Sequence, residues 1–392
     1  MSDSSKYERR GVSATKSEVH AAIKGLDKGL YPKAFCKILP DFSAGDPEYC
    51  NLMHADTAGT KPSLAYMYWK ETGDLSVWEG IAQDALVMNL DDMACVGCVD
   101  DIIISSTIGR NKGLVSGDVI KTIIQYTQRF AQEMEELGVK LHLAGGETAD
   151  VGDIVRTVDV GYTAFGRMRR DDLLVNHIQP GDVIVGYASY GQATYETSYN
   201  GGMGSNGLTS ARHDVFDHGY AGQYPESFDP SLPEDVVYIG GKKLTETIDV
   251  DGEAIPIGKL VLSPTRTYLP LIKQLFTHLK ADMHGMIHCT GGGQTKVVKF
   301  IDNVKVIKDN FLPIPPLFNL IQSVSGTGWK EMYQVFNMGH RLEVYLPEDK
   351  AAEAIALGEQ FGIAAQVVGR VEASDAPEVE IRTPHGTFNY NE

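Results

Sequence analysis

Three clusters of charged and oxygen-bearing side chains in the first half of the sequence have the chemistry needed to bind a metal ion and a polyphosphate. They are residues 56–61 (DTAGTK), the pair Asp91 and Asp92, and residues 144–150 (AGGETAD). Magnesium prefers oxygen ligands and usually takes one or two carboxylates together with phosphate oxygens and water. Carboxylates that converge on one cleft repel each other unless cations lie between them. The clusters therefore predict a site for magnesium and ATP.

The usual nucleotide-binding motifs do not account for these clusters. The sequence contains no G-x-x-x-x-G-K-[ST] P-loop. Residues 202–207 fit G-x-G-x-x-G, but they lie in an irregular stretch without the preceding strand that a dinucleotide site requires. Any single aspartate is equally well explained by a helix cap or a solvated surface. The prediction of a metal site thus depends on the three clusters occurring together.

Size and composition restrict the class of protein. A chain of 392 residues predicts two domains, and a net charge of −17 argues against nucleic acid as a partner. Apolar runs are too short for a membrane span, and the first residues lack the apolar core of a signal sequence, so we expect a cytoplasmic protein. Cys95 and Cys98 form a Cys-x-x-Cys pair without a second pair, which favours two buried thiols over a zinc or redox site.

Two modules of helix, strand and glycine loop predict two α/β domains. In the first module, apolar residues recur at helical spacing over 118–137, and a short strand over 141–143 leads into Gly145 and Gly146. Glycine lets a backbone approach a ligand closely. A helix that starts at such a loop adds N–H groups for an anion. Two tight turns are the alternative explanation of these glycines.

The second module and the domain boundary follow the same reasoning. A helix over 268–279 and a strand over 283–289 precede a run of glycines. Strands at 158–164 and 183–188 flank a charged stretch, which places the boundary near residue 170. The predicted domains are 1–170 and 171–392.

The second domain also contains an unusual segment at about 190–250. It is rich in Gly, Tyr, Asp, Ser and Pro, and its apolar residues show little periodicity. A segment of this length inside a compact enzyme is usually a lid, an oligomer contact or a mobile insertion. The sequence does not distinguish among these.

Several motifs together resemble the phosphoribosylformylglycinamidine cyclo-ligase family, whose members are also called aminoimidazole ribonucleotide synthetases. The similarity runs almost from end to end of the chain. In the N-terminal half, the matching positions are residues 7–12, Lys24, residues 56–61, Asp84, Met88, Asp92, Gly97 and the G-G-E-T-A of 145–149. In the C-terminal half they are S-N-G at 205–207, P-T-R-x-Y at 264–268, H-x-T-G-G-G at 288–293, E-M-Y at 331–333 and F-N-x-G at 336–339.

The chain departs from the family pattern at some positions. Asp91 stands where the family usually has Asn, and Gly204 stands where many members have His before S-N-G. Thr57 and Ala58 replace Gly-Val, and the early glycine-rich loop is missing. These differences mark a divergent branch and leave the exact substrate open.

The resemblance implies a fold, an activity and an assembly. The implied α/β fold has two domains, and strands from the N-terminal domains of a homodimer close a shared barrel. The implied reaction is the ATP-dependent cyclisation of formylglycinamidine ribonucleotide to aminoimidazole ribonucleotide in purine biosynthesis. It proceeds by phosphorylation of an amide oxygen followed by ring closure, with ATP and Mg²⁺ as cofactors.

We expect the following residues to carry this chemistry. The metal ligands are Asp56, Asp92 and Glu147. The groups that bind ATP or its phosphates are Lys24, Asp56, Gly59, Thr60, Lys61, Asp91, Gly145, Gly146, Glu147 and Thr148. The groups that bind the substrate are Ser205, Asn206, Gly291, Gly292 and Gly293. Lys61 and His288 are the catalytic candidates, although a buried histidine satisfied by a backbone carbonyl explains His288 equally well.

Other functions remain open at this point. Selenophosphate synthetase and thiamine monophosphate kinase share the superfamily and use similar ATP sites. The first would need a reactive Cys near the N-terminus, and Cys36 aligns better with a cyclo-ligase core segment. A nucleotide-binding regulator without catalysis is an alternative of a different class, supported only by Gly204 and the altered glycine loop.

Overall fold

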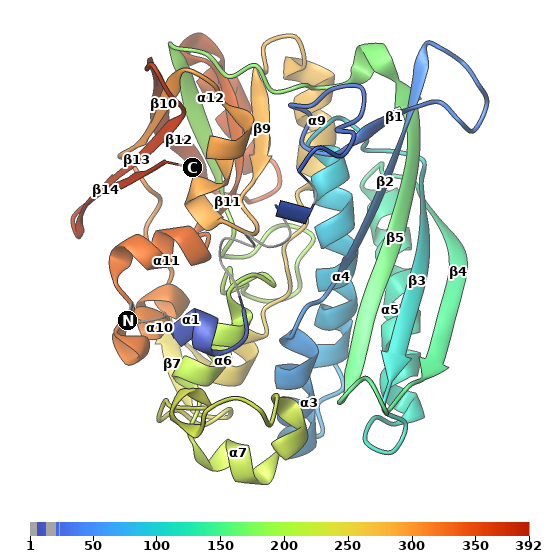
Figure 1. The fold of residues 1–392 in the computed structure, drawn as a ribbon, viewed down its shortest axis with the longest axis vertical. Helices are drawn as coiled ribbons and strands as arrows, with labels where there is room; N and C mark the ends of the chain where they lie inside the picture. Colours follow the sequence, from blue (N-terminus) through green and yellow to red (C-terminus); the bar gives the residue numbers. More distant parts are fainter. Residues whose placement is uncertain (1–5, 13–20, 23, 392) are drawn as a thin grey trace.

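Two large β-sheets, a two-stranded hairpin and helices between and around the sheets make up the described part of the chain. The computed structural model describes residues 6–12, 21–22 and 24–391. In Figure 1 the first sheet lies along one side of the molecule and the second sheet lies on the opposite side. The strands of the first sheet all precede residue 170, and the strands of the second all follow it. The expected two-domain α/β fold class is confirmed.

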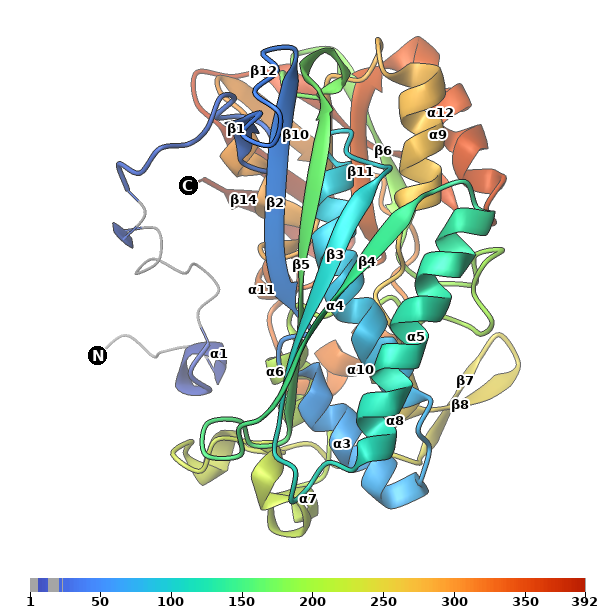
Figure 2. The same cartoon turned by 90° about the vertical axis from the view of Figure 1, so that its right-hand side faces the viewer.

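The first sheet has five strands in the order β1-β2-β5-β3-β4. They are β1 (Ile38–Pro40), β2 (Tyr49–Thr57), β3 (Ile102–Arg110), β4 (Leu141–Asp150) and β5 (Val158–Arg169). Neighbours run antiparallel except β3 and β4, which run parallel. Figure 2 shows β2, β5, β3 and β4 side by side. Among the described residues the edge strands β1 and β4 do not pair, so one chain forms an open sheet and not a barrel.

Two helices, α4 (Val77–Ala94) and α5 (Gly117–Glu136), pack on one face of this sheet. Helix α5 buries a stripe that includes Ile123 and Phe130 and leaves its other side in solvent, as the periodicity predicts. Helix α4 is buried on nearly all sides, even at Asp84, because it lies between the first sheet and the second domain. The other helix of this domain is α3 (Lys61–Thr72).

The glycines at 145 and 146 lie inside β4 and not in a loop, so the prediction of a glycine loop there was wrong. The pairing of β3 with β4 shifts between Ile104 and Ser106, which gives β4 one extra residue, a β-bulge. Gly145 has a φ of +82°, and a Cβ on Gly146 would lie 2.2 Å from the Ser106 carbonyl oxygen. The bulge therefore explains both glycines without a ligand.

The second sheet has seven strands in the order β14-β13-β10-β12-β6-β11-β9. They are β6 (Asp182–Ala188), β9 (Gly285–His288), β10 (Val304–Lys308), β11 (His340–Pro347), β12 (Ala365–Ala373), β13 (Glu378–Thr383) and β14 (Gly386–Tyr390). Helices α9 (Leu269–Leu279) and α12 (Ala351–Glu359) pack against each other, and α12 packs on β6 and β12. A 3₁₀ helix, Gly293–Phe300, follows β9.

The segment at about 190–250 is packed on the rest of the molecule. It contains α6 (Leu208–Val215), α7 (Gly219–Gln223) and, at its end, β7 (Thr247–Val250), which pairs with β8 (Glu253–Pro256). Helix α6 contacts α1 (Lys6–Arg9) and α3. The buried guanidinium of Arg10 donates a hydrogen bond of 2.7 Å to Asp214.

The remaining helices are α8 (Ile257–Val261), α10 (Pro316–Ser325) and α11 (Trp329–Val335). No helix in the described part of the chain is long and apolar enough to cross a membrane. All five cysteines, including Cys95 and Cys98, are buried free thiols.

Candidate functional site

Two buried aspartates on α4 bind the second domain. Asp84 accepts hydrogen bonds from the backbone N–H and the hydroxyl of Thr265, at 2.7 and 2.6 Å. Asp91 accepts hydrogen bonds from the hydroxyl of Thr267 and the backbone N–H of Tyr268, at 2.7 and 2.8 Å. The two aspartates are seven residues apart, so they lie on one face of the helix. Together they fix the segment that leads into α9.

Lys61 takes part in the same domain contact and does not face a ligand. Its Nζ donates to Asp84 Oδ1 at 3.0 Å, to the Gly204 carbonyl at 3.1 Å and to the Ser263 carbonyl at 2.6 Å. Burial lowers the pKa of Lys61, while the charge of Asp84 opposes that shift. An ammonium group has three N–H donors, and all three are used here. This bonding differs from the predicted phosphate-binding and catalytic role.

Asp91 also differs from its predicted role as an ATP ligand. Its side chain is buried and both carboxylate oxygens already accept hydrogen bonds. Burial raises the pKa of Asp91 to about 7, against the opposing effects of the Tyr268 and Thr267 donors. The residue therefore acts as a contact between the domains.

Asp92, the next residue, forms the centre of the candidate site with two residues of the second sheet. Asp92 Oδ1 lies 2.7 Å from His288 Nδ1, and the other ring nitrogen of His288 lies 3.2 Å from Arg341 Nε. An arginine N–H only donates, so His288 Nε2 must accept this hydrogen bond. The ring proton is therefore on Nδ1, which donates a hydrogen bond to Asp92. The chain of hydrogen bonds thus runs from Arg341 through His288 to Asp92.

This arrangement makes His288 a positioning group. The imidazole is fully buried, and both of its ring nitrogens are occupied. Burial lowers the pKa of His288 to about 4, although Asp92 opposes the shift. A neutral ring with no free nitrogen does not exchange protons with a ligand, so His288 orients its neighbours. Its partners are side chains and not the backbone carbonyl that the sequence offers as an alternative.

His54 and Lys296 complete the surroundings of Asp92. His54 Nε2 lies 3.6 Å from Asp92 Oδ2, and its Nδ1 lies 3.0 Å from Asn89 Oδ1. Lys296 donates a hydrogen bond to the Thr290 hydroxyl. Burial on its own would raise the pKa of Asp92, but Lys296 and the two histidines outweigh it and lower that pKa. Asp92 is therefore an ionised carboxylate that nearby basic groups stabilise. Its side chain is 13% exposed.

Two backbone segments lie beside this centre. The first contains Gly204, Ser205 and Asn206, and the second begins at Gly291. A Cβ on Gly291 would lie 3.6 Å from the Asn206 side-chain nitrogen, so the two segments adjoin. The structure thus brings together the residues predicted to bind substrate. Gly293, the last of the glycine run, has φ +50° and packs too closely against the Tyr333 carbonyl for any side chain.

Asp56 and Glu147 do not meet Asp92 in one chain. Strand pairing aligns Thr57, Gly161, Thr107 and Glu147 in one row, three strand spacings or roughly 14 Å long. Asp56 precedes Thr57 by one residue, so it points to the opposite face of the sheet from Glu147. Among the described residues no three His, Cys, Asp or Glu side chains form a group that could hold a metal ion. A site that combines Asp56, Asp92 and Glu147 stays a prediction.

The other predicted ATP ligands are scattered. Lys24 and Gly59 are exposed, and the Thr60 hydroxyl is 2.8 Å from the Thr209 hydroxyl. Residues from β4 and α5 line a groove of about 390 Å³ that includes Gly145, Gly146 and Thr148.

Three residues of the site, His54, Lys296 and Arg341, were missed by reasoning from the sequence. The alternation of side chains along a strand places His54 on the same face as Asp56, and that signal was available. Lys296 follows the glycine run by three residues, one helical turn. Nothing in the sequence connects Arg341 with His288, because the contact depends on β11 pairing with β9.

Comparisons with known proteins point to one family. The model of the AIR synthase related protein N-terminal domain matches residues 36–168, and that of the C-terminal domain matches residues 179–382. A protein of Methanocaldococcus jannaschii named phosphoribosylformylglycinamidine cyclo-ligase is 26% identical over 83% of this chain and 79% of its own length. A Methanococcus vannielii protein of the same name is 26% identical over 97% of this chain and 92% of its own.

Solved structures share the fold at low sequence identity. The structure titled T. maritima PurL complexed with FGAR has a TM-score of 0.54 and 15% identity, covering 96% of this chain. The chain spans about half of that protein, 49% of its length. The hydrogenase maturation protein HypE has a TM-score of 0.53 and 16% identity, covering 86% of this chain and 87% of its own.

Proposed function

The chain belongs to the AIR synthase related family, and from that premise we propose that it is an ATP-dependent cyclo-ligase that converts formylglycinamidine ribonucleotide to aminoimidazole ribonucleotide. The names of the relatives support this activity. The structural observation that carries the proposal is the hydrogen bond between Asp92 and His288. It joins the acidic helix of the first domain to the H-x-T-G-G-G segment of the second, where the motifs of both halves of the chain meet.

The proposed reaction requires an amide oxygen to become a leaving group. ATP transfers a phosphoryl group to that oxygen, the amidine nitrogen of the same molecule attacks the carbon, and phosphate leaves as the ring closes. Phosphoryl transfer depends mainly on positioning and on neutralising charge. Ring closure is intramolecular, so a site that holds the substrate folded supplies much of the acceleration.

We propose that the ribose phosphate of the substrate lies between the two adjoining segments. Ser205 and Asn206 offer a hydroxyl and an amide, and the backbone N–H groups around Gly291 offer further donors. Lys296 adds a positive charge beside Thr290. In this arrangement Asp92 and His288 position the residues that surround the substrate, and neither exchanges protons with it.

Magnesium bound to ATP is part of the proposal, and Asp56 and Glu147 are the carboxylates that fit it. Both side chains are exposed and keep access to an ion, whereas Asp92 is already engaged by His288. When bound, the metal neutralises phosphate charge.

A homodimer is also proposed, with a second copy on the outer face of the first sheet. Met53 and Ile103 lie on this face and are 63% and 43% exposed, and Phe165 stands between them in the strand register. An apolar row of this kind on an open sheet indicates a protein contact. The unpaired edges β1 and β4 give the second copy a place to extend the sheet.

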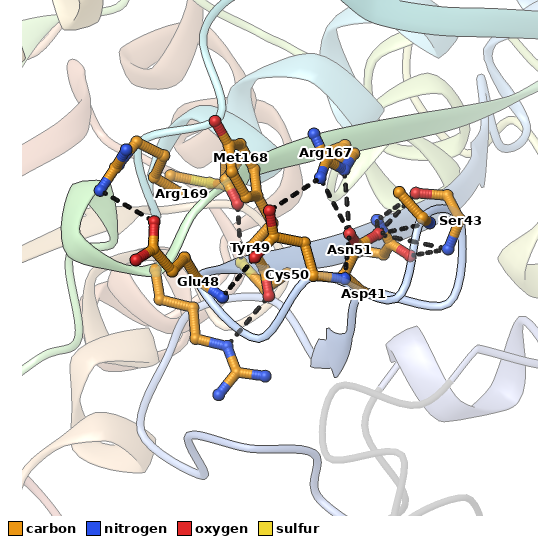
Figure 3. Close-up of polar contacts among 12 residues, drawn as sticks. Asp41, Ser43, Glu48, Tyr49, Cys50, Asn51, Arg167, Met168 and Arg169 are labelled. Atoms are coloured by element: carbon orange, nitrogen blue, oxygen red, sulfur yellow. Dashed lines mark hydrogen bonds and ion pairs between the residues drawn. The ribbon is translucent and has the colours of Figure 1, made fainter.

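A polar cluster, drawn in Figure 3, lies two residues along β2 and β5 from this apolar row. Asp41 accepts hydrogen bonds from the guanidinium of Arg167, the side-chain amide of Asn51 and the hydroxyl of Ser43. These donors, Arg167 above all, hold the pKa of Asp41 well below its usual range. Arg167 also lies over the ring of Tyr49, 3.8 Å from its centre. The cluster keeps the loop after β1 in place beside the proposed contact.

The activity is tested by coupled ADP release from the purified protein. Formylglycinamidine ribonucleotide with ATP and magnesium is compared with thiamine phosphate and with selenide as the second substrate. We expect ADP release with the ribonucleotide alone, accompanied by aminoimidazole ribonucleotide. ADP release with thiamine phosphate or selenide would instead assign the chain to a different branch of the superfamily. Tight ATP binding without turnover of any of the three would favour a regulator.

A further inference from the structure

The guanidinium of Arg341 has one nitrogen without a partner. Its Nε donates to His288 Nε2 at 3.2 Å, and its Nη2 donates to the Arg266 carbonyl at 2.6 Å. The side chain is only 2% exposed, yet Nη1 makes no hydrogen bond with any described residue. The described residues also provide no carboxylate within ion-pair distance of it, although the charge of Arg341 acts on Asp91 through space.

A buried donor without an acceptor is costly. Leaving such a group unsatisfied destabilises a protein, and the cost is larger when the group is charged. Buried polar groups are therefore nearly always hydrogen-bonded, and an exception in a well-packed site calls for a ligand or a functional reason. Both carboxylate oxygens of the neighbouring Asp91, by contrast, accept a hydrogen bond.

The free nitrogen lies against the backbone of the S-N-G segment. A Cβ on Gly204 would stand 2.8 Å from Arg341 Nη1, so a side chain there would displace the guanidinium from this position. Gly204 also has φ +67°, which L-residues rarely adopt. Here the small residue and the buried guanidinium occupy the space together, one residue before Ser205.

We propose that Arg341 binds a phosphate oxygen of the substrate through Nη1 and that Asp92, acting through His288, positions it. The inference rests on the proposed function, because that function places a ribose phosphate beside Ser205 and Asn206. A guanidinium suits this task, since its planar donors match phosphate oxygens and it stays charged when buried. Lys296 donates to the Thr290 hydroxyl, and Gly291 of the next segment adjoins the Asn206 side chain.

The test compares two glycine substitutions that impose equal backbone strain. Gly204→Ala and Gly326→Ala both place a Cβ on a residue with φ +67°, but the alanine at 326 meets nothing within 4 Å. Inorganic phosphate is titrated against each purified protein, and the midpoint of thermal unfolding is recorded. We expect phosphate to raise the midpoint equally in the wild type and in Gly326→Ala. In Gly204→Ala the apparent phosphate affinity should fall by about tenfold or more.

A second variant keeps the test decisive if Gly204→Ala does not fold. Arg341→Lys retains the charge but loses the rigid fork, so phosphate affinity should again fall by about tenfold, with KM for the ribonucleotide rising more than kcat falls. Equal phosphate responses in Gly204→Ala and Gly326→Ala would overturn the proposal, as would a wild-type protein that does not respond to phosphate. These measurements need no turnover. Absent cyclisation with intact phosphate binding would therefore refute the proposed function and leave the role of Arg341 standing.

Discussion

Asp92 on α4 and His288 at the end of β9 are 196 residues apart in sequence and share a hydrogen bond of 2.7 Å between Oδ1 and Nδ1. Because Arg341 occupies the other ring nitrogen, the imidazole is held neutral and in one tautomer. The carboxylate, the ring and the guanidinium therefore form one unit that spans both domains. The geometry of the candidate site depends on that unit being complete.

Replacing Asp92 with Asn should reduce turnover far more than stability. Asparagine keeps the shape and still accepts the His288 proton through its oxygen, so the loss in unfolding free energy should stay near 1–3 kcal/mol. The negative charge near Lys296 disappears and the groups around it lose their positions, so we expect kcat to fall by roughly a hundredfold. Steady-state ADP release and urea denaturation measure the two effects.

A surface pair provides the matched control for this variant. Asp101 Oδ1 lies 3.0 Å from His142 Nε2, but both side chains are largely exposed. Asp101→Asn should change neither kcat nor the unfolding free energy appreciably. If Asp92→Asn and Asp101→Asn behave alike in turnover, Asp92 has no part in the site.

Periodicity and glycine patterns predicted the framework of this molecule. The helix over 118–137 is α5, and the strand before the glycines at 291–293 is β9, because apolar spacing reports directly which face of an element is buried. The pair Gly145 and Gly146 was wrongly predicted to form a ligand-binding loop, and the reason is physical. A bulge in an edge strand and a ligand loop both need small residues with unusual backbone angles, so the sequence pattern is the same.

The composition of the site was only partly predictable. Asp92 and His288 belong to recognisable motifs, but their contact with Arg341 arises from the pairing of β11 with β9. Motif positions also do not report bonding partners. Lys61 ends a motif that is predicted to bind phosphate. Its ammonium group nonetheless donates hydrogen bonds to Asp84 and two backbone carbonyls. Whether a charged residue faces a ligand or a buried partner is decided by tertiary packing.

Removing the Lys61 ammonium should destabilise the fold. In Lys61→Met the charge of Asp84 is left buried without its cation, and breaking a buried ion pair in this way costs about 3–5 kcal/mol. Lys243, which is 56% exposed and pairs with Asp217, provides the control, and Lys243→Met should cost less than about 1 kcal/mol. Urea denaturation measures both. An unchanged stability of Lys61→Met together with a raised KM for ATP would restore the phosphate role.

Asp91 and His288 should give opposite pH dependence to the stability. The folded pKa of Asp91 is raised to about 7, so its proton is bound more tightly in the folded state and stability falls as pH rises from about 4 to 7. The folded pKa of His288 is lowered to about 4, so stability rises with pH between about 4 and 6.5. In the wild-type protein the two slopes oppose each other.

Asp91→Asn should remove one of these slopes. Asparagine accepts a hydrogen bond from the Tyr268 N–H and donates one to the Thr267 hydroxyl, so both contacts survive. The stability of the variant should then rise with pH between about 4 and 6.5, where the wild-type curve is flatter. Unfolding free energies across this pH range measure the difference, and superimposable curves would contradict the assignment of Asp91.

Placing a charge on the outer face of the first sheet should separate the proposed dimer. Met53 is 63% exposed in one chain and lies in the apolar row with Phe165 and Ile103. Met53→Lys would bury an unpaired ammonium at the contact, which raises the dimer dissociation constant by orders of magnitude. Ile124 on α5 is 50% exposed on the other side of the sheet, so Ile124→Lys is the control and should remain dimeric. Light scattering after size exclusion gives the masses. A wild type that elutes as a monomer, or a Met53→Lys variant with the same mass as Ile124→Lys, would exclude this face as the contact.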